Sequence, residues 1–188
     1  TVIGVGDMSG DVFGNGMLLS KQIRLIAAFD HRDIFIDPDP GDPERRWEER
    51  QRLFELGRST WRDYDKRLLS KGGGIFSRAE KSIKLTPEIQ ALTGLTRKSV
   101  PPNALIQALL RTQAELVWFG GIGTYVKASS EQNWQVGDKA NDGVRIDAAE
   151  LGAQVVGEGA NLGMTQAARI EFDRCGGKVN ADFVDNSA

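Results

Sequence analysis

The chain has 188 residues, of which 40% are hydrophobic and 27% are charged, proportions that are ordinary for a globular domain. Its 24 basic and 26 acidic residues leave a formal net charge of −2, so the chain offers no basic field to nucleic acid or to an anionic membrane. The single cysteine, Cys175, cannot form an internal disulfide and fits a reducing compartment such as the cytoplasm. No apolar run approaches the roughly 20 residues that span a bilayer.

The two ends of the sequence suggest a segment of a longer polypeptide. The first residue is Thr1, and a strand-like run follows it immediately. The last residues, "DFVDNSA", stop without a helix or a polar tail. We therefore expect the chain to be part of a larger protein.

The first part of the chain alternates strand-like and helical segments. Residues 2–5 predict a short buried strand, and residues 13–21 predict the helix after it. Residues 23–30, "IRLIAAFD", have the near-continuous hydrophobicity of a parallel strand that is covered on both faces. Residues 34–37 predict a short strand or a turn of helix, and "DPDPGDP", residues 37–43, predicts a break.

Residues 38–100 have a different character and predict a helical insertion in the domain. Residues 43–56 form a charged amphipathic pattern that is typical of a helix. Residues 59–69 predict a second helix, and "KGGGIF", residues 71–76, predicts a flexible turn. Residues 86–95 predict a short helix that Thr86 caps and that ends near Gly94.

The strand–helix rhythm returns after residue 100. Residues 101–113 predict a mostly apolar helix. A strand that runs into a glycine loop is predicted twice, by "AELVWFGGIGT" and by "AQVVGEGANLG". Residues 165–177 predict a helix capped by Thr165. Residues 178–186 predict a final strand. The order of elements predicts an α/β fold, Rossmann-like and doubly wound, with a mostly parallel sheet and the helical insertion within it.

Three predicted strands end in small-residue loops: "GVGDMSG", "FGGIGT" and "VGEGAN". Ligands of open α/β sheets bind outside the carboxyl ends of the strands, where the strand order switches. Small residues let the backbone approach a ligand, and a following helix N-terminus offers N–H groups to phosphate. The three loops together therefore predict a nucleotide site.

The first loop departs from the usual G-x-G-x-x-G fingerprint. Gly4 and Gly6 supply the first two glycines, Ser9 stands where the third would fall, and Gly10 comes one residue late. Ser9 is small enough for a helix to pack there. The loop predicts a pyrophosphate site with a lengthened turn.

Asp30, at the end of the second predicted strand, is placed to bind a ribose hydroxyl. Its carboxylate would repel a 2′-phosphate and so favours NAD over NADP. His31 and Arg32 weaken that preference, because they could meet a phosphate. The competing interpretation is that Asp30 caps the next turn.

The residues alone leave several classes of protein open. They are a dinucleotide-binding domain, a methyltransferase-like domain for S-adenosylmethionine, a flavodoxin-like domain and a non-catalytic nucleotide-sensing module. Asn161 could contact a cofactor or start an Asx turn, and Glu158 could be a solvent-facing loop charge. His31 is the only histidine and has no neighbours in metal-ligand spacing, so we expect no metal site.

Longer motifs narrow these alternatives. "GVGDMSGDVFGNGMLLS", "AAFDHRDIFIDPDP", "GGIGTYVKAS" and "VVGEGANLGMTQ", with "KGGGIFSR" and "DFVDNSA", resemble the bacterial NAD-specific glutamate dehydrogenases of the large-subunit class. The resemblance runs from Val2 to the end of the chain. "EGAN" also matches the smaller glutamate dehydrogenases, which are more distant relatives.

The resemblance implies a two-domain enzyme that oxidises L-glutamate to 2-oxoglutarate and ammonia and passes hydride to NAD. Residues 1–188 would be its NAD-binding domain, and the substrate domain, which holds the catalytic lysine and aspartate, would precede residue 1. No catalytic residue is therefore assigned here. Glutamate or 2-oxoglutarate would bind at the cleft between the two domains, and we expect the full-length enzyme to be a homo-oligomer.

The resemblance also assigns roles to residues of the loops. The pyrophosphate would lie on the first loop, the adenosine ribose on the second strand, the other ribose on the "GGIGT" loop, and the nicotinamide near "EGAN" and the C-terminus. The corresponding residues are Gly4, Gly6, Asp7, Met8, Ser9 and Gly10 for the pyrophosphate; Asp30 for the adenosine ribose; Gly120, Gly121, Ile122, Gly123 and Thr124 for the second ribose; Asn161 for the nicotinamide or its ribose; and Asn186 for the domain cleft.

Overall fold

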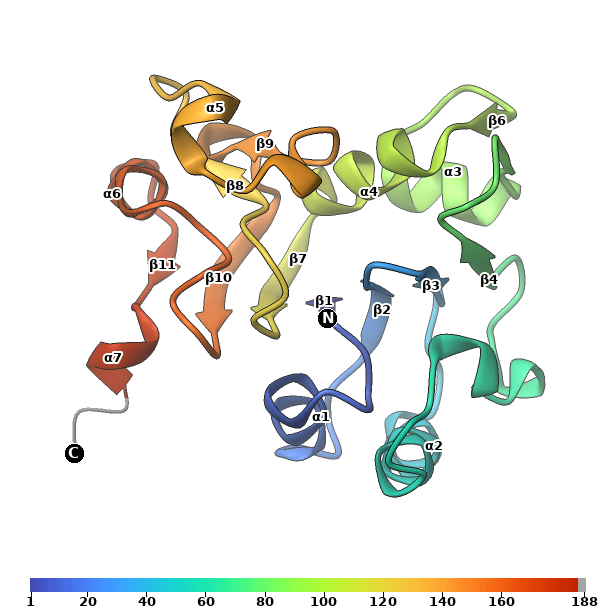
Figure 1. Cartoon of the computed structure of the whole chain (residues 1–188). Coiled ribbons are helices and arrows are strands. Elements are labelled where there is room, and N and C mark those ends of the chain that lie inside the picture. Colours follow the sequence, from blue (N-terminus) through green and yellow to red (C-terminus); the bar gives the residue numbers. More distant parts are fainter. Residues whose placement is uncertain (186–188) are drawn as a thin grey trace.

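The structure is a computed structural model that describes residues 1–185 of the chain. Within that part, the main sheet has seven strands, and Figure 1 shows β1 at its centre between β2 and β7. Their order across the sheet is β11 (Lys178–Val179), β10 (Ala153–Glu158), β7 (Ala114–Phe119), β1 (Val2–Val5), β2 (Leu25–Phe29), β3 (Asp33–Ile36) and β4 (Gly74–Ser77).

The strand directions identify a doubly wound sheet. β11, β10, β7, β1 and β2 run parallel, β3 runs antiparallel to β2, and β4 runs antiparallel to β3. The chain leaves β1 toward β2 and later returns to the other side of β1 as β7. The strand order therefore switches between β1 and β7, as predicted for a Rossmann-like α/β fold.

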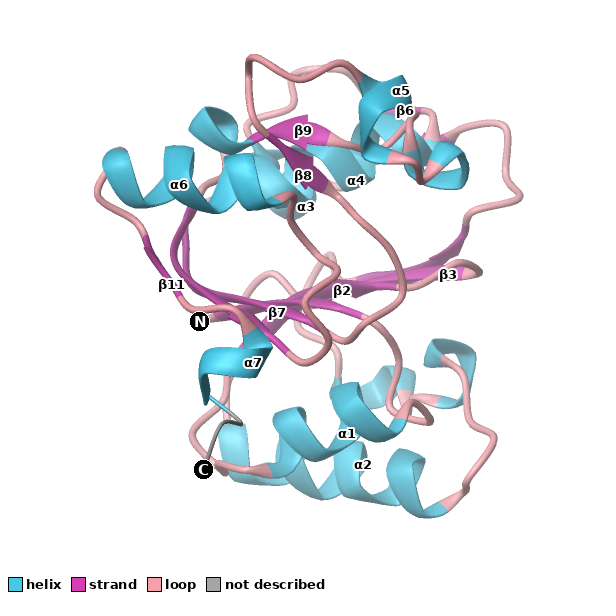
Figure 2. Cartoon of the chain, turned by 60° about the vertical axis from the view of Figure 1, so that its left-hand side comes forward, coloured by secondary structure: helices cyan, strands magenta, loops and turns pink. Residues whose placement is uncertain are grey.

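Helices cover both faces of the sheet, as Figure 2 shows. One face carries α1 (Asp11–Leu18) and α2 (Pro43–Glu55). The other carries α3 (Pro87–Thr93), α4 (Pro102–Arg111) and α6 (Gln166–Arg174). Every residue of β1 and β2 is buried, because both faces of these strands are covered.

The remaining elements are short. β5 (Ile83–Lys84) pairs with β6 (Ser99–Val100), and β8 (Val126–Lys127) pairs with β9 (Ile146–Asp147). Two further helices, α5 (Asn133–Val136) and α7 (Asp182–Asp185), have one turn each. No helix within residues 1–185 is long and apolar enough to cross a lipid bilayer.

Several predicted helix ends are confirmed. Thr86 caps α3 by accepting the N–H of Ile89 at 3.2 Å, and Gly94 ends that helix in the left-handed conformation with φ 71°. Thr165 caps α6 by accepting the N–H of Ala168 at 3.0 Å.

Three local predictions were wrong. Residues 59–69 form two 3-10 turns, Trp61–Asp63 and Lys66–Leu68, because the side chains of Thr60 and Asp65 each cap a new turn. The predicted flexible turn at residues 71–76 includes most of β4, so the segment 38–100 contributes a strand to the main sheet as well as helices. The predicted final strand keeps only two residues, in β11, before α7 begins.

Candidate functional site

The loops that follow β1, β7 and β10 touch one another at the carboxyl ends of the strands. A Cβ on Gly120 would lie 2.8 Å from both Phe13 Cβ and the Val5 carbonyl oxygen. A Cβ on Gly121 would lie 3.0 Å from the Cβ of Ala160 in the β10 loop. The glycines therefore allow the loops to meet at the switch point of the sheet, beside the start of α1.

The β1 loop folds around the side chain of Asp7. Asp7 Oδ1 accepts the N–H groups of Ser9 at 3.0 Å and Gly10 at 3.1 Å, and the Ser9 hydroxyl at 2.6 Å. Two backbone donors that a pyrophosphate could use are thus already occupied. Met8 is buried in the core, so its side chain does not face the site.

The start of α1 remains available to an anion. Gly10 is the N-cap residue, and no side chain caps the helix. The first-turn N–H groups of a helix have no intrahelical acceptor, and the helix dipole favours negative charge there. Asp11 places a carboxylate in the same turn, which partly opposes that attraction.

Asp30 is 1% exposed and its two carboxylate oxygens have different surroundings. Oδ1 accepts the N–H groups of Arg32 at 2.6 Å and Asp33 at 2.7 Å, so the turn-capping interpretation is correct for this oxygen. Oδ2 is buried without a hydrogen-bond partner among the described residues, and Arg32 Nη2 lies 3.7 Å from it. Asp30 therefore caps its turn with one oxygen, while its other oxygen is an unsatisfied acceptor that the protein encloses.

Arg32 links Asp30 to the β1 loop. Its Nη2 donates to Asp7 Oδ2 at 3.0 Å. Burial raises the pKa of Asp30, and the nearby Asp7 carboxylate adds to that rise. Burial also acts to raise the pKa of Asp7, but hydrogen bonding to Ser9, Asp30 and Arg32 outweighs it, so the pKa of Asp7 is lowered.

A basic hollow of about 450 Å³ lies next to Asp30. Its polar lining comes from the β2–β3 turn, the segment 38–100 and the start of α4: His31, Arg32, Arg62, Ser77, Arg78 and Asn103. Arg78 Nη1 donates to the Asp30 carbonyl oxygen at 2.8 Å. The sequence around Arg62 and Arg78 does not mark them as site residues, because only the pairing of β3 with β4 brings that segment to the end of β2.

A second hollow of similar size lies at the C-terminal end of α6. It measures about 440 Å³ and is lined by Ala153, Phe172 and Cys175, among others. It lies away from the three loops, at the start of β10. Ligand sites in sheets of this kind are set by the switch point, so we do not regard this hollow as the functional site.

The β7 loop is held from one side by residues 126–150, which we call the β8–β9 lobe. Thr124 is buried, and its N–H donates to Asp138 Oδ2 at 2.8 Å. Gly121 and Gly123 have φ values of 83° and 145°, which favour glycine. Ile122, between them, is exposed.

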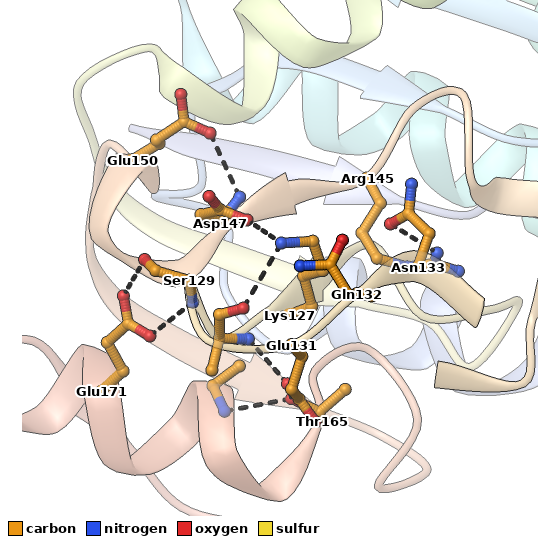
Figure 3. A network of polar contacts seen from close by, with 12 residues as sticks. Lys127, Ser129, Glu131, Gln132, Asn133, Arg145, Asp147, Glu150, Thr165 and Glu171 are labelled. Atoms are coloured by element: carbon orange, nitrogen blue, oxygen red, sulfur yellow. Dashed lines mark hydrogen bonds and ion pairs between the residues drawn. The ribbon is translucent and has the colours of Figure 1, made fainter. Parts of the chain in front are cut away.

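A polar network fastens the β8–β9 lobe to α6, as Figure 3 shows. The N–H of Ser129 donates to Glu171 at 2.7 Å. Glu131 accepts the hydroxyl of Thr165, the residue that caps α6. Every member of this network that Figure 3 labels comes from the lobe or from the start and middle of α6, so the network fixes the lobe beside the β10 loop.

The β10 loop is organised by a buried ion pair. Glu158 accepts the N–H of Met164 at 3.0 Å and pairs with Arg169 at 2.6 Å. Burial raises the pKa of Glu158, although Arg169 acts in the opposite direction. The interpretation of Glu158 as a solvent-facing charge was therefore wrong.

Asn161 lies at the tip of the β10 loop. Within residues 1–185 it is the one non-glycine residue with a positive φ, 50°. Such a backbone is tolerated by asparagine better than by most residues and occurs often at binding sites. Asn186, the other residue predicted at the nicotinamide end, lies outside the described residues.

The fold and these loops define a Rossmann-like, doubly wound α/β domain with small-residue loops converging at its switch point. The chain belongs to the family of bacterial NAD-glutamate dehydrogenases: the family model described as bacterial NAD-glutamate dehydrogenase, catalytic domain, matches residues 1–188. The resemblance found in the motifs is thereby confirmed. The methyltransferase-like, flavodoxin-like and sensor alternatives are left without support.

Three curated relatives carry the name NAD-specific glutamate dehydrogenase. The chain is 58% identical over 187 residues to the protein of Pseudomonas aeruginosa, 56% over 195 residues to that of Mycobacterium tuberculosis and 55% over 187 residues to that of Halomonas elongata. Each alignment covers 100% of this chain and 12% of the relative. The chain therefore spans about one eighth of the length of these relatives.

Proposed function

We propose that this chain is the NAD-binding domain of an NAD-dependent glutamate dehydrogenase, with residues 38–100 inserted in it. The complete enzyme would convert L-glutamate to 2-oxoglutarate and ammonia as a homo-oligomer. The observation that carries the proposal is the meeting of the β1, β7 and β10 loops at the switch point, where open α/β sheets bind nucleotides.

The residues present fit the adenosine half of NAD. The unsatisfied Oδ2 of Asp30 would accept a hydroxyl of the adenosine ribose, which requires the side chains that cover this buried oxygen to move aside. The hollow of about 450 Å³ beside it offers room for the adenine, against the guanidinium groups of Arg62 and Arg78. Arg32 lies close to Oδ2, so the ribose would share this end of the site with it.

The β1 loop has fewer backbone N–H groups available to bind a pyrophosphate than the sequence suggested. Ser9 and Gly10 give their N–H groups to Asp7 in this structure. The uncapped start of α1 supplies other donors, and Arg32 offsets the charge of Asp7. We propose that the first turn of α1, which follows Gly10, binds the pyrophosphate, with Gly4 and Gly6 giving the close turn.

NAD, when bound, supplies the acceptor for the hydride of glutamate. The residues of this chain would bind and orient it: Asp30 the adenosine ribose, residues 120–124 the second ribose, and Asn161 the nicotinamide end. The Glu158–Arg169 pair would hold the β10 loop in position for Asn161. The groups that move protons on glutamate would lie outside these 188 residues, in the substrate domain before residue 1.

The surroundings of Asp30 support a preference for NAD over NADP. A 2′-phosphate would bring negative charge to a buried carboxylate, which is unfavourable at short range. Arg32, whose Nη2 lies 3.7 Å from Asp30 Oδ2, is engaged with Asp7 and Asp30 and is not free to neutralise that phosphate.

Titration of the purified chain with NAD, NADP and S-adenosylmethionine, by calorimetry, tests the proposal. We expect NAD to bind most tightly. Binding of S-adenosylmethionine alone would contradict the proposal. In a parallel assay with glutamate and NAD, we expect no NADH, and its formation would show that proton-transfer groups lie within the chain.

A further inference from the structure

The β8–β9 lobe carries a buried arginine that contacts the β7 loop directly. The side chain of Arg145 is 0% exposed. Its Nε donates to the Thr124 carbonyl oxygen at 3.0 Å and its Nη2 to the Asp138 carbonyl oxygen at 2.6 Å. Its Nη1 donates to Asp142 at 2.6 Å and to Asn133 at 3.1 Å, as Figure 3 shows for Asn133. The planar guanidinium therefore joins three segments of the lobe to the end of the β7 loop.

Asp138, in the same lobe, makes a second contact with the β7 loop. Its Oδ2 accepts the N–H of Thr124 at 2.8 Å and the side-chain amide of Asn141 at 2.7 Å. Both backbone groups of Thr124 are thus fixed, the N–H by Asp138 and the carbonyl by Arg145.

Gly123 shows how closely the lobe lies behind the loop. A Cβ at this position would lie 2.3 Å from Asn141 Nδ2 and 3.0 Å from Asp138 Oδ2. The space between loop and lobe therefore admits no side chain. Any displacement of Asp138 or Asn141 changes the surface against which residues 121–124 rest.

We propose that Asp138 and Arg145 are positioning residues that set the conformation of the β7 loop for the nicotinamide-side ribose. This inference rests on the proposed function, because it requires that NAD lies along residues 120–124. Neither side chain need touch NAD. The lobe that carries them would control the nicotinamide half of the site and leave the adenosine half, around Asp30, unaffected.

The test compares three ligands with the Asp138→Ala variant: NAD, ADP-ribose, which keeps the second ribose, and ADP, which lacks it. We expect the variant to bind NAD and ADP-ribose about tenfold more weakly, as for the loss of a charge-assisted hydrogen bond that orders the loop. ADP should bind as it does to the unmodified chain. A purely structural role for Asp138 would weaken all three ligands together.

Arg111→Gln is the matched control. The substitution removes an exposed ion pair in which Arg111 Nη2, on α4, lies 3.0 Å from Glu150 Oε1 at the far end of the same lobe. This ion pair does not contact the β7 loop. We expect it to leave all three affinities unchanged. If Asp138→Ala fails to fold, Asp138→Asn keeps one acceptor oxygen and the side-chain volume, and should show a smaller but equally selective loss.

Unchanged affinity for NAD in a folded Asp138 variant would overturn the inference, and so would an equal loss for NAD and ADP. If the unmodified chain bound none of the three ligands, the proposed function would fail and the inference with it. If the unmodified chain bound NAD and the variants showed no selective loss, only the inference would fail.

Discussion

Trp61 donates its indole N–H to the carbonyl oxygen of Gly6 at 2.9 Å, across 55 residues of sequence. Trp61 is fully buried and packs edge-on against Phe13, a buried residue in the first turn of α1. The carbonyl of Gly6 belongs to the β1 loop. The segment 38–100 therefore supports the β1 loop of the candidate site, in addition to lining the hollow next to Asp30.

Trp61→Phe tests this support. The substitution keeps an aromatic ring and leaves the buried Gly6 carbonyl without its donor, so we expect the free energy of unfolding to fall by about 1–3 kcal/mol. Urea denaturation measures the change. Trp134, which is 79% exposed, provides the control: Trp134→Phe should leave stability unchanged. Equal effects of the two substitutions would show that the contact to Gly6 contributes nothing.

Asp30→Asn should weaken NAD binding by about tenfold or more, because the amide replaces the carboxylate that would accept the ribose hydroxyl. The remaining carbonyl oxygen can still accept the N–H groups of Arg32 and Asp33, so the turn should persist. The discrimination against NADP should also decrease, since a buried negative charge is removed. Calorimetric titration with both dinucleotides measures these effects, and unchanged affinities would exclude Asp30 from the site.

The raised pKa of Asp30 predicts a particular dependence of stability on pH. Burial raises this pKa above its ordinary value of 3.8, so between the two values the folded chain holds a proton that the unfolded chain has lost. The contribution of Asp30 to stability is therefore present at low pH and is lost as pH rises through its folded-state pKa.

Asp30→Asn removes that contribution, together with its influence on the pKa of Asp7, since the variant cannot titrate at this position. The free energy of unfolding of the unmodified chain, relative to that of Asp30→Asn, should decrease as pH rises from 3.8. Urea denaturation across this range measures it. A relative stability that increased with pH would mean that the pKa of Asp30 is lowered.

Glu158→Gln should destabilise the chain by about 3 kcal/mol, because the nearly buried guanidinium of Arg169 loses its carboxylate. The β10 loop should become more mobile, and backbone relaxation of residues 159–163 would report it. Glu150→Gln breaks an exposed pair with Arg111 and should cost less than about 1 kcal/mol. A loss of similar size in both variants would contradict the structural role assigned to Glu158.

Local patterns were sufficient to predict the strands and loops of the candidate site. Buried apolar runs followed by glycines mark β1, β7 and β10, and their meeting follows from parallel strands and a switch point. Thr86, Gly94 and Thr165 end their helices through contacts within a few residues, which a sequence displays directly.

Long-range contacts could not be predicted in the same way. Residues 59–69 have helical spacing, but the burial of Trp61 against the β1 loop and the caps at Thr60 and Asp65 favour separate turns. The hydrogen bond from Arg145 to the Thr124 carbonyl oxygen likewise depends on how the β8–β9 lobe packs against the β7 loop. Nothing in the sequence around Trp61 indicates its contact with the β1 loop, and nothing around Arg145 indicates its contact with Thr124.

Hydrogen–deuterium exchange of the purified chain, with and without NAD, tests the central claim most directly. We predict slower exchange in residues 6–12, 120–124 and 159–163, the three loops at the switch point, and no change in strands β5 and β6. Protection around the hollow at the C-terminal end of α6, with none in the three loops, would contradict the account.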